Sequence, residues 1–255
     1  MDTFPFYLVA ASVALLIGFS KGGLGGAVGA LATPLMALVM PADQVIGLML
    51  PILMFADIFA VASHWKRWDG RLIGLMLPGA VVGVTLGTYV ITNAPREMLK
   101  TLFGVIVLIF ALYKGLEAWW SGRAGEGAKD GAEQDQPDKD WRGVLAGTVA
   151  GFASALAHTG GPPVSMYLLI RRVPTRTFNA TSALFFAIIN WVKVPYYVYA
   201  GLFDRGRILS ILWILPLLPL GVWGGKWLAE KISREGFERV IVGLLGVTAV
   251  WLILS

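Results

Sequence analysis

Long apolar segments alternate along this chain with short segments that carry most of its charge. A bilayer core needs about 20 apolar helical residues to cross it. Backbone groups within that core must bond to one another, so such segments form helices. The pattern therefore predicts a polytopic, all-α membrane protein. The segments expected to be helical are Phe4–Met40, Val45–Ser63, Leu72–Val90, Leu99–Tyr113, Val144–Ile170, Phe178–Gly201, Ile208–Leu228 and Val240–Leu254.

Composition agrees with this pattern and narrows the function classes. Hydrophobic residues make up 56% of the 255 residues and charged residues 15%, whereas soluble domains carry about 25% charged residues. There is no cysteine and there are two histidines, so we expect no metal site and no cofactor. The net charge of +5 is explained by basic loops that orient a membrane protein, and no nucleic-acid partner is expected. The first residues lack the basic region and cleavage site of a signal peptide, so the first segment is expected to stay in the protein.

One polar segment divides the chain into two halves. Six acidic residues lie between positions 126 and 140, among glycines and a proline and with few apolar neighbours. Such a composition cannot bury a core and is typical of a flexible linker. The predicted organisation is a first transmembrane repeat over residues 1–120, a linker over 121–142 and a second repeat over 143–255.

The two halves share weakly similar residues in the same order. Gly18-Phe19 corresponds to Gly151-Phe152, Met40-Pro41 to Val173-Pro174, and Asp57 to Asn190; later, Gly83-Val84 corresponds to Gly221-Val222 and Arg96-Glu97 to Arg234-Glu235. Internal repeats of this size are common in transporters, where the site lies at the repeat interface.

The first segment of each half is broken by glycines. Phe4–Met40 has 37 residues, nearly twice a span, and is interrupted at residues 21–26; Val144–Ile170 is interrupted at residues 157–163. Each segment is either one long broken helix or a hairpin of two short helices that returns to its own side. With single crossings the loops carry 10 and 9 Lys and Arg on the two sides, and with hairpins 15 and 4. The positive-inside rule favours the asymmetric count.

The hairpin alternative fixes a complete topology. It gives two inverted repeats, each a re-entrant, broken helix pair followed by three transmembrane helices. The protein is then expected in a bacterial-type inner membrane. Both termini would lie outside and the linker in the cytoplasm.

The glycine-rich breaks are the first candidate binding residues. A helix start exposes unbonded N–H groups and a partial positive charge, both of which favour anions, and glycine allows a close approach to the backbone. Lys21 would add a charge and Thr159 a hydroxyl donor. The alternative is that small residues serve close helix packing. The candidates are Lys21, Gly22, Gly23, Gly25 and Gly26 in the first break and His158, Thr159, Gly160 and Gly161 in the second.

Three polar residues within the predicted spans are the second set of candidates. A charge at the bilayer centre costs about 2.5–3.5 kcal/mol on insertion scales and usually marks a pathway. Lys193 and Asn190 are three residues apart and therefore share a helix face, where they could bind an anion. Asp57, with His158, could carry a proton. Two alternatives remain open: Asp57 and Lys193 form a buried pair that joins the halves, or Lys193 extends toward the interface.

Other features are expected to be structural. His64 lies beside Trp65, Lys66, Arg67 and Trp68, a combination typical of an interfacial anchor. Prolines within the predicted spans indicate kinks, at Pro51, Pro78, Pro195, Pro216 and Pro219.

At the two breaks the sequence resembles the sulfite exporter TauE/SafE family of membrane permeases. The resemblance extends over nearly the whole chain apart from the linker. It implies transport of sulfite, sulfonates or related small anions without fixing the substrate. Many relatives lack the Lys21 and His158 found here. The residues that carry the resemblance are Gly18-Phe19-Ser20-Lys21-Gly22-Gly23 with Gly25-Gly26, then Gly151-Phe152, Ala157-His158-Thr159-Gly160-Gly161-Pro162-Pro163, Thr181-Ser182 and Asn190.

The sequence thus predicts a secondary transporter of a small anion. Its transport would be coupled to protons if Asp57 or His158 takes up and releases a proton during the cycle. A passive anion channel is the first alternative. A membrane-embedded enzyme is the second and is disfavoured, because no catalytic or metal-ligand cluster is evident. The expected partners are the anionic substrate and the lipid bilayer. Substrate identity, direction, coupling ion and a homodimeric state stay open.

Overall fold

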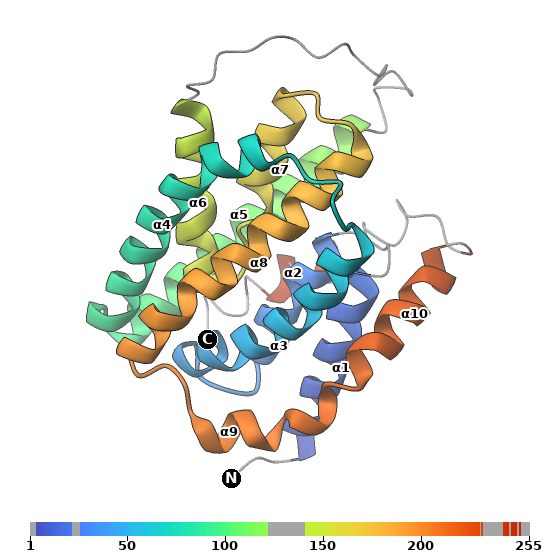
Figure 1. The fold of residues 1–255 in the computed structure, drawn as a ribbon. Coiled ribbons are helices and arrows are strands. Elements are labelled where there is room, and N and C mark those ends of the chain that lie inside the picture. Colours follow the sequence, from blue (N-terminus) through green and yellow to red (C-terminus); the bar gives the residue numbers. More distant parts are fainter. Residues whose placement is uncertain are drawn as a thin grey trace.

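The computed structural model describes residues 4–21, 26–121, 141–229, 231, 242–244, 246–248 and 250, and within these ranges it contains helices and no strands. Figure 1 shows their arrangement. The first half contributes α1 (Phe4–Phe19), α2 (Gly26–Met36), α3 (Ala42–Ser63), α4 (Gly70–Asn93) and α5 (Arg96–Ser121). The second half contributes α6 (Trp141–Ala157), α7 (Gly161–Ile170), α8 (Thr175–Tyr199), α9 (Arg205–Ser210), the short 3₁₀ helix η2 (Leu212–Ile214) and α10 (Leu217–Ala229).

The helices follow the predicted apolar segments with two corrections. The segment Leu99–Tyr113 is part of a longer helix, α5, which continues to Ser121 through residues counted as loop. The segment Ile208–Leu228 was expected to be one helix, but the chain is broken there into α9, η2 and α10, and its two parts are bent by 47°. Pro216 lies in the break and Pro219 in the first turn of α10; each lacks the N–H that would continue the hydrogen-bonding ladder. Most of the segment Val240–Leu254 lies outside the described residues, and the parts of it that are described, such as 242–244, are helical.

Among the described residues, α3 over Gln44–Ser63 and α4 over Gly70–Asn93 are long and apolar enough to cross a membrane. The bent pair of Arg205–Ile214 and Leu217–Gly225 forms a third such segment if it is counted as one span. The 25-residue α8 is also long, but it carries polar residues such as Asn190 and Lys193.

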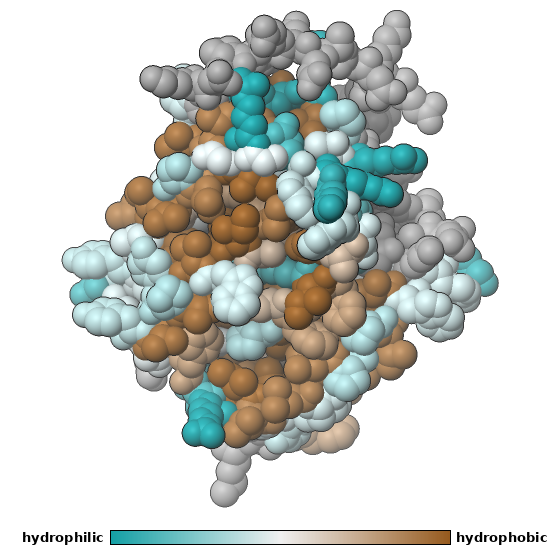
Figure 2. All heavy atoms as spheres, viewed as in Figure 1, coloured by the Kyte–Doolittle hydropathy of each residue, from teal (hydrophilic) through white to brown (hydrophobic). Residues whose placement is uncertain are grey.

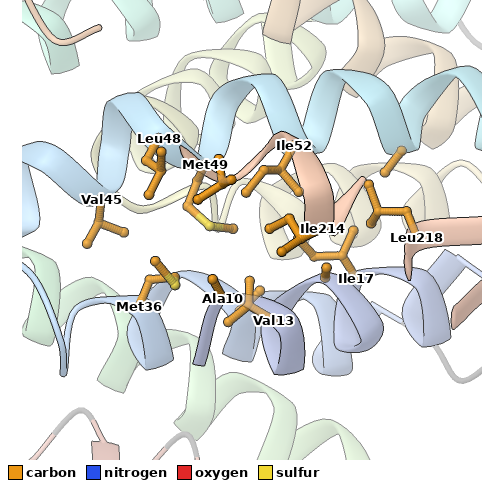
Figure 3. Close-up of a cluster of buried hydrophobic side chains, with 14 of the residues drawn as sticks. Ala10, Val13, Ile17, Met36, Val45, Leu48, Met49, Ile52, Ile214 and Leu218 are labelled. Atoms are coloured by element: carbon orange, nitrogen blue, oxygen red, sulfur yellow. The ribbon is translucent and has the colours of Figure 1, made fainter. Parts of the chain in front are cut away.

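The two helices on either side of each glycine-rich break pack against each other. In Figure 3, Met36 of α2 lies beside Ala10 of α1, although 26 positions separate them in the sequence. In the second half, a Cβ atom added at Gly143, near the start of α6, would lie 2.9 Å from the hydroxyl of Tyr167 in α7. A single long helix would keep these residues far apart, because each residue adds about 1.5 Å along a helix.

The two halves are interlocked through their helices. The most extensive helix contact joins α4 of the first half to α6 of the second, and the next joins α1 to α10. In Figure 1, α4 and α6 lie together on one side, α1 and α10 on the other, and α3 and α8 cross between them. Each half therefore gives one helix to the packing of the other.

Glycines permit these close contacts. A Cβ atom at Gly79 or Gly83 of α4 would collide with backbone carbonyls of Val144 and Thr148 in α6. At the other contact, a Cβ atom at Gly18 would lie 2.6 Å from the carbonyl oxygen of Leu218. Small residues that bring backbones together are the usual basis of helix association in membranes. Close helix packing was the alternative considered for the glycines of the two breaks; here it is the role of glycines outside the breaks.

Buried apolar side chains form a separate cluster on each side of the molecule. One cluster (Figure 3) joins α1, α2 and α3 to Ile214 and Leu218 from the second half. Another joins α4 to α6, α7 and α8, with Met76, Val84 and Phe185 completely buried.

The outer surface is largely apolar. Brown, hydrophobic atoms cover most of the middle of the face shown in Figure 2. Large apolar side chains such as Trp191 and Leu86 are at least half exposed. A soluble protein rarely exposes continuous apolar patches of this extent, whereas lipid tails solvate such a surface. The fold is that of a helical, membrane-embedded protein.

Candidate functional site

Asp57 of α3 is the centre of a buried polar contact between the halves. Its carboxylate is 3.0 Å from the ammonium of Lys21, which follows α1. Its second oxygen accepts a hydrogen bond of 2.6 Å from the side-chain amide of Asn190 in α8. Asp57 and Asn190 are only 4% and 5% exposed. The charge of this aspartate is therefore matched inside the protein by one cation and one amide donor.

The ion-pair partner of Asp57 is not the lysine that the sequence analysis considered. A pair between Asp57 and Lys193 was one alternative, but the ion pair of Asp57 is with Lys21. In the alignment of the two halves predicted from the sequence, Asp57 corresponds to Asn190, 133 residues later. The hydrogen bond joins these two positions of α3 and α8.

Lys193 lies on the same face of α8 as Asn190 and is completely buried. Its ammonium donates to the Ser154 carbonyl at 3.3 Å and to the Ser154 hydroxyl at 3.1 Å. It also lies 3.0 Å from Nδ1 of His158. Lys193 does not extend toward the membrane interface. Within the described residues no carboxylate forms an ion pair with it, although Asp57 is close enough to act on it electrostatically.

His158 directly follows α6 and has a left-handed backbone conformation, with φ of 54°. Glycine is the usual residue for such a conformation, and a side chain there is strained. The ring of His158 contacts two groups: Nδ1 faces Lys193, and Nε2 lies 3.1 Å from the carbonyl oxygen of Ile46 in α3. A strained conformation held by two polar contacts is typical of a functional position.

Ser154 is a member of this cluster that the sequence did not identify as a binding residue. It follows Lys21 by the same 133 residues that separate Asp57 from Asn190, so the repeat alignment contained a signal for it. In the first half the cation is at the end of α1 and its partner is on α3. In the second half the cation is on α8 and its partner, Ser154, is on α6. The Ile46 carbonyl, a backbone atom, had no signal in the sequence.

The second glycine-rich break contains a buried hydroxyl and a helix start. Thr159 is 4% exposed, and in the described part of the chain its hydroxyl has no hydrogen-bond partner. Gly160 is the N-cap of α7, and an added Cβ at Gly161 would meet nothing within 4 Å. Pro162 and Pro163 remove two N–H groups from the first turn of α7. This helix start therefore presents fewer backbone donors than the sequence argument assumed.

The first break is only partly described. Gly22, Gly23 and Gly25 lie outside the described residues, and Gly26 begins α2. Of the candidates in that break, the structure places the side chain of Lys21, at the edge of the buried cluster.

His64 lies apart from this cluster, in the turn between α3 and α4. Burial, with the positive charges of Arg67 and Lys21, lowers the pKa of His64 below its usual 6.5. Trp65 and Trp68 make an edge-on contact beside it, with ring centroids 5.6 Å apart. Asp69 caps α4 by accepting hydrogen bonds from the N–H groups of Arg71 and Leu72. These features suit a span end, as predicted.

Comparison with known proteins identifies the family. The profile of the family Sulfite exporter TauE/SafE matches residues 10–252, nearly the whole chain. Neither the comparison with curated proteins nor that with solved structures found a match. The matched region includes α6, α7, α2, all of α1 after its first six residues, and every residue of the buried cluster. The chain is therefore a member of the TauE/SafE family of sulfite exporters, which are membrane transporters.

Proposed function

We propose that this protein is a secondary transporter that moves sulfite, an organosulfonate or a related small anion across the inner membrane. The observation that carries the proposal is the buried cluster in which two lysines, Lys21 and Lys193, accompany one carboxylate, Asp57. A buried charge without a counter-charge is unfavourable in a medium of low dielectric constant. A substrate anion would supply the missing charge.

The bound anion would contact groups from both halves. Lys193 and Asn190 would approach it from α8, the hydroxyl of Thr159 from the second break, and Lys21 from the first. Gly161 would admit the anion close to the backbone, whereas Gly160 packs against the Ala150 carbonyl and would serve the site as the N-cap of α7. This arrangement is supported by the hydroxyl of Thr159, which has no partner among the described residues, and by the open space beside Gly161.

The proposed architecture is a pair of inverted repeats with re-entrant hairpins. It is supported by the hairpin folding of α1–α2 and α6–α7 and by the reciprocal contacts α1–α10 and α4–α6. The loop charges then place both termini outside and residues 121–142 in the cytoplasm. Residues 1–120 and 143–255 are the proposed repeats.

Alternating access would come from movement between two packing units. Because α4 and α10 are exchanged between the halves, each unit would combine helices of both. One unit would contain α1, α2 and α10, and the other α4, α6 and α7. The bond between Asp57 and Asn190 lies where α3 meets α8, between these units, and would change during the cycle.

Proton coupling would use Asp57 or His158, which are titratable groups within the cluster. Flux that responds to an imposed pH gradient supports this coupling. Flux that is unchanged by the gradient excludes it.

The decisive experiment compares anion flux into proteoliposomes for the wild type, Lys193→Met and Lys66→Gln. Lys193→Met keeps the length of the buried side chain and removes its charge, and we expect saturable sulfite flux to be lost. Lys66→Gln removes an exposed lysine in the turn after α3 and should leave the flux unchanged. Equal flux in the wild type and Lys193→Met would refute the site, provided that both proteins elute alike in gel filtration.

A passive anion channel is separated from a transporter by counterflow. A transporter preloaded with unlabelled sulfite accumulates labelled sulfite transiently above its external concentration. A channel dissipates the gradient without such accumulation.

A further inference from the structure

We infer that the buried cluster binds an anion with a single negative charge and discriminates against a dianion. This inference rests on the proposed function and specifies its substrate class. It follows from the number of charges in the cluster and from the hydrogen bonds that fix the protonation state of His158.

The charged side chains described in the cluster are Lys21, Asp57 and Lys193. Lys21 and Asp57 form an ion pair at 3.0 Å and together contribute no net charge. Lys193 contributes one positive charge, and its ammonium hydrogens are directed to acceptors on Ser154 and His158. The residues between Lys21 and α2 are Gly22, Gly23, Leu24 and Gly25, none of which is ionisable.

His158 adds no charge to this sum. Its Nδ1 lies 3.0 Å from Nζ of Lys193, and a charged lysine can only donate. Nδ1 must therefore accept, and the ring proton must lie on Nε2. That nitrogen faces the Ile46 carbonyl at 3.1 Å, which accepts the proton in a hydrogen bond. With Lys193 in its charged form, both contacts are satisfied by the neutral imidazole with its proton on Nε2.

The cluster therefore presents one net positive charge. His64, in the turn after α3, is another titratable group near Lys21, but burial and the charges of Arg67 and Lys21 lower its pKa below 6.5, so it adds no charge at pH 7. A monoanion would bring the occupied site to neutrality. A dianion would leave one uncompensated negative charge in a region where Lys193 is completely buried and Asp57 is 4% exposed. The low dielectric constant of such a region makes an uncompensated charge unfavourable.

The test uses wild-type protein in proteoliposomes and competitors of similar size but fixed charge. Methanesulfonate and sulfamate each carry one negative charge, whereas sulfate carries two. Sulfamate controls for the methyl group of methanesulfonate, since it has a polar group in that place. We expect both monoanions to inhibit labelled sulfite flux at concentrations at least about tenfold lower than sulfate, a difference of about 1.4 kcal/mol.

A variant changes the charge without a large change in shape. Asp57→Asn raises the net charge of the cluster to two, and Asn190 can turn its amide to accept from the new residue. In this variant we expect the ratio of the inhibitory concentration of sulfate to that of methanesulfonate to fall by about tenfold or more. Glu97→Gln removes an exposed carboxylate in the first turn of α5 and should leave the competition pattern unchanged.

The outcomes separate this inference from the proposed function. If folded wild-type protein transports no sulfur oxyanion and none competes, the proposed function fails. If flux is present but sulfate competes as well as the monoanions, the function stands and the charge selectivity is refuted. The wild-type competition decides this even if Asp57→Asn does not fold.

Discussion

His158 and Lys193 depend on each other for their positions. The left-handed conformation of His158 directs its ring between the ammonium of Lys193 and the Ile46 carbonyl. The position equivalent to His158 in the first half is Gly25, the residue type that suits such a conformation. Histidine here thus combines an unfavourable backbone conformation with a polar contact that glycine cannot make.

Two substitutions of His158 separate the backbone from the side chain. Both His158→Gly and His158→Ala remove the ring and should abolish anion flux. Glycine adopts the left-handed conformation without strain, whereas alanine is strained there. We therefore expect His158→Ala to be less stable than His158→Gly by about 1 kcal/mol. Thermal unfolding in detergent measures the difference. Equal stability of the two variants would contradict the left-handed conformation.

His64 allows a pH prediction outside the spans. Burial, followed by the charges of Arg67 and Lys21, lowers the pKa of His64 below 6.5. An unfolded His64 therefore binds a proton at a pH where the folded residue does not. The stability associated with His64 is present above pH 6.5 and is lost as pH falls through the lower, folded-state pKa.

Histidine-selective NMR labelling measures this titration, because the chain has two histidines and His64→Gln assigns the signals. We expect the His64 signal to titrate below pH 6.5. Arg67→Gln should raise its pKa toward 6.5 without reaching it, since burial, the larger cause, remains. A midpoint at or above 6.5 in the wild type would contradict the interpretation.

At the scale of helices, the glycine faces decide which elements pair. Along α4, Gly79, Gly83 and Gly87 follow at intervals of four residues, and all three face α6. The same spacing in α6 places Gly147 and Gly151 against Met76 and Ala80 of α4. Residues four apart share a helix face, so this spacing removes side chains along one continuous line of contact.

Alanine at Gly83 tests this packing, with Gly74 of the same helix as control. A Cβ at Gly83 would collide with the Thr148 carbonyl, whereas a Cβ at Gly74 meets nothing within 4 Å. We expect Gly83→Ala to reduce stability by about 1–3 kcal/mol. Gly74→Ala should leave it unchanged or raise it by up to about 1 kcal/mol. Thermal unfolding of both variants in detergent is the measurement, and equal effects would argue against a close α4–α6 contact.

At the scale of the whole molecule, the exchange of α4 and α10 makes the two halves interdependent. Neither half can complete its apolar clusters alone, since Ile214 and Leu218 complete the cluster around α1 and α4 contributes to the one around α8. The polar cluster lies between these two apolar clusters. Its groups come from α3, α6, α8 and Lys21, which follows α1.

The orientation of the molecule is testable because the chain has no cysteine. Lys66 lies in the turn before α4 and Asn93 is its last residue, and the 24 residues of this helix extend about 36 Å. We expect a membrane-impermeant maleimide to label Asn93→Cys in intact cells and Lys66→Cys only after permeabilisation. The reverse pattern would invert the proposed topology, and labelling of both in intact cells would exclude α4 as a span.

The sequence by itself determined the class of protein and much of the helix layout. Apolar segments of span length leave the backbone no alternative to helices in lipid, and α3, α4 and α8 follow their predicted segments. It also identified buried residues such as Asp57, Asn190 and Lys193, because a polar residue in an apolar segment is conspicuous.

The tertiary structure alone decided how these residues are joined. Whether Asp57 pairs with Lys21 or Lys193 depends on the crossing of α3 and α8, which a one-dimensional pattern does not contain. The same is true of the break at Pro216, the exchange of α4 and α10, and the contact of His158 with a backbone carbonyl. Helix formation depends on the apolar residues of each segment and the lipid around it, which the sequence shows. Contacts between helices depend on which surfaces fit together once the helices have formed.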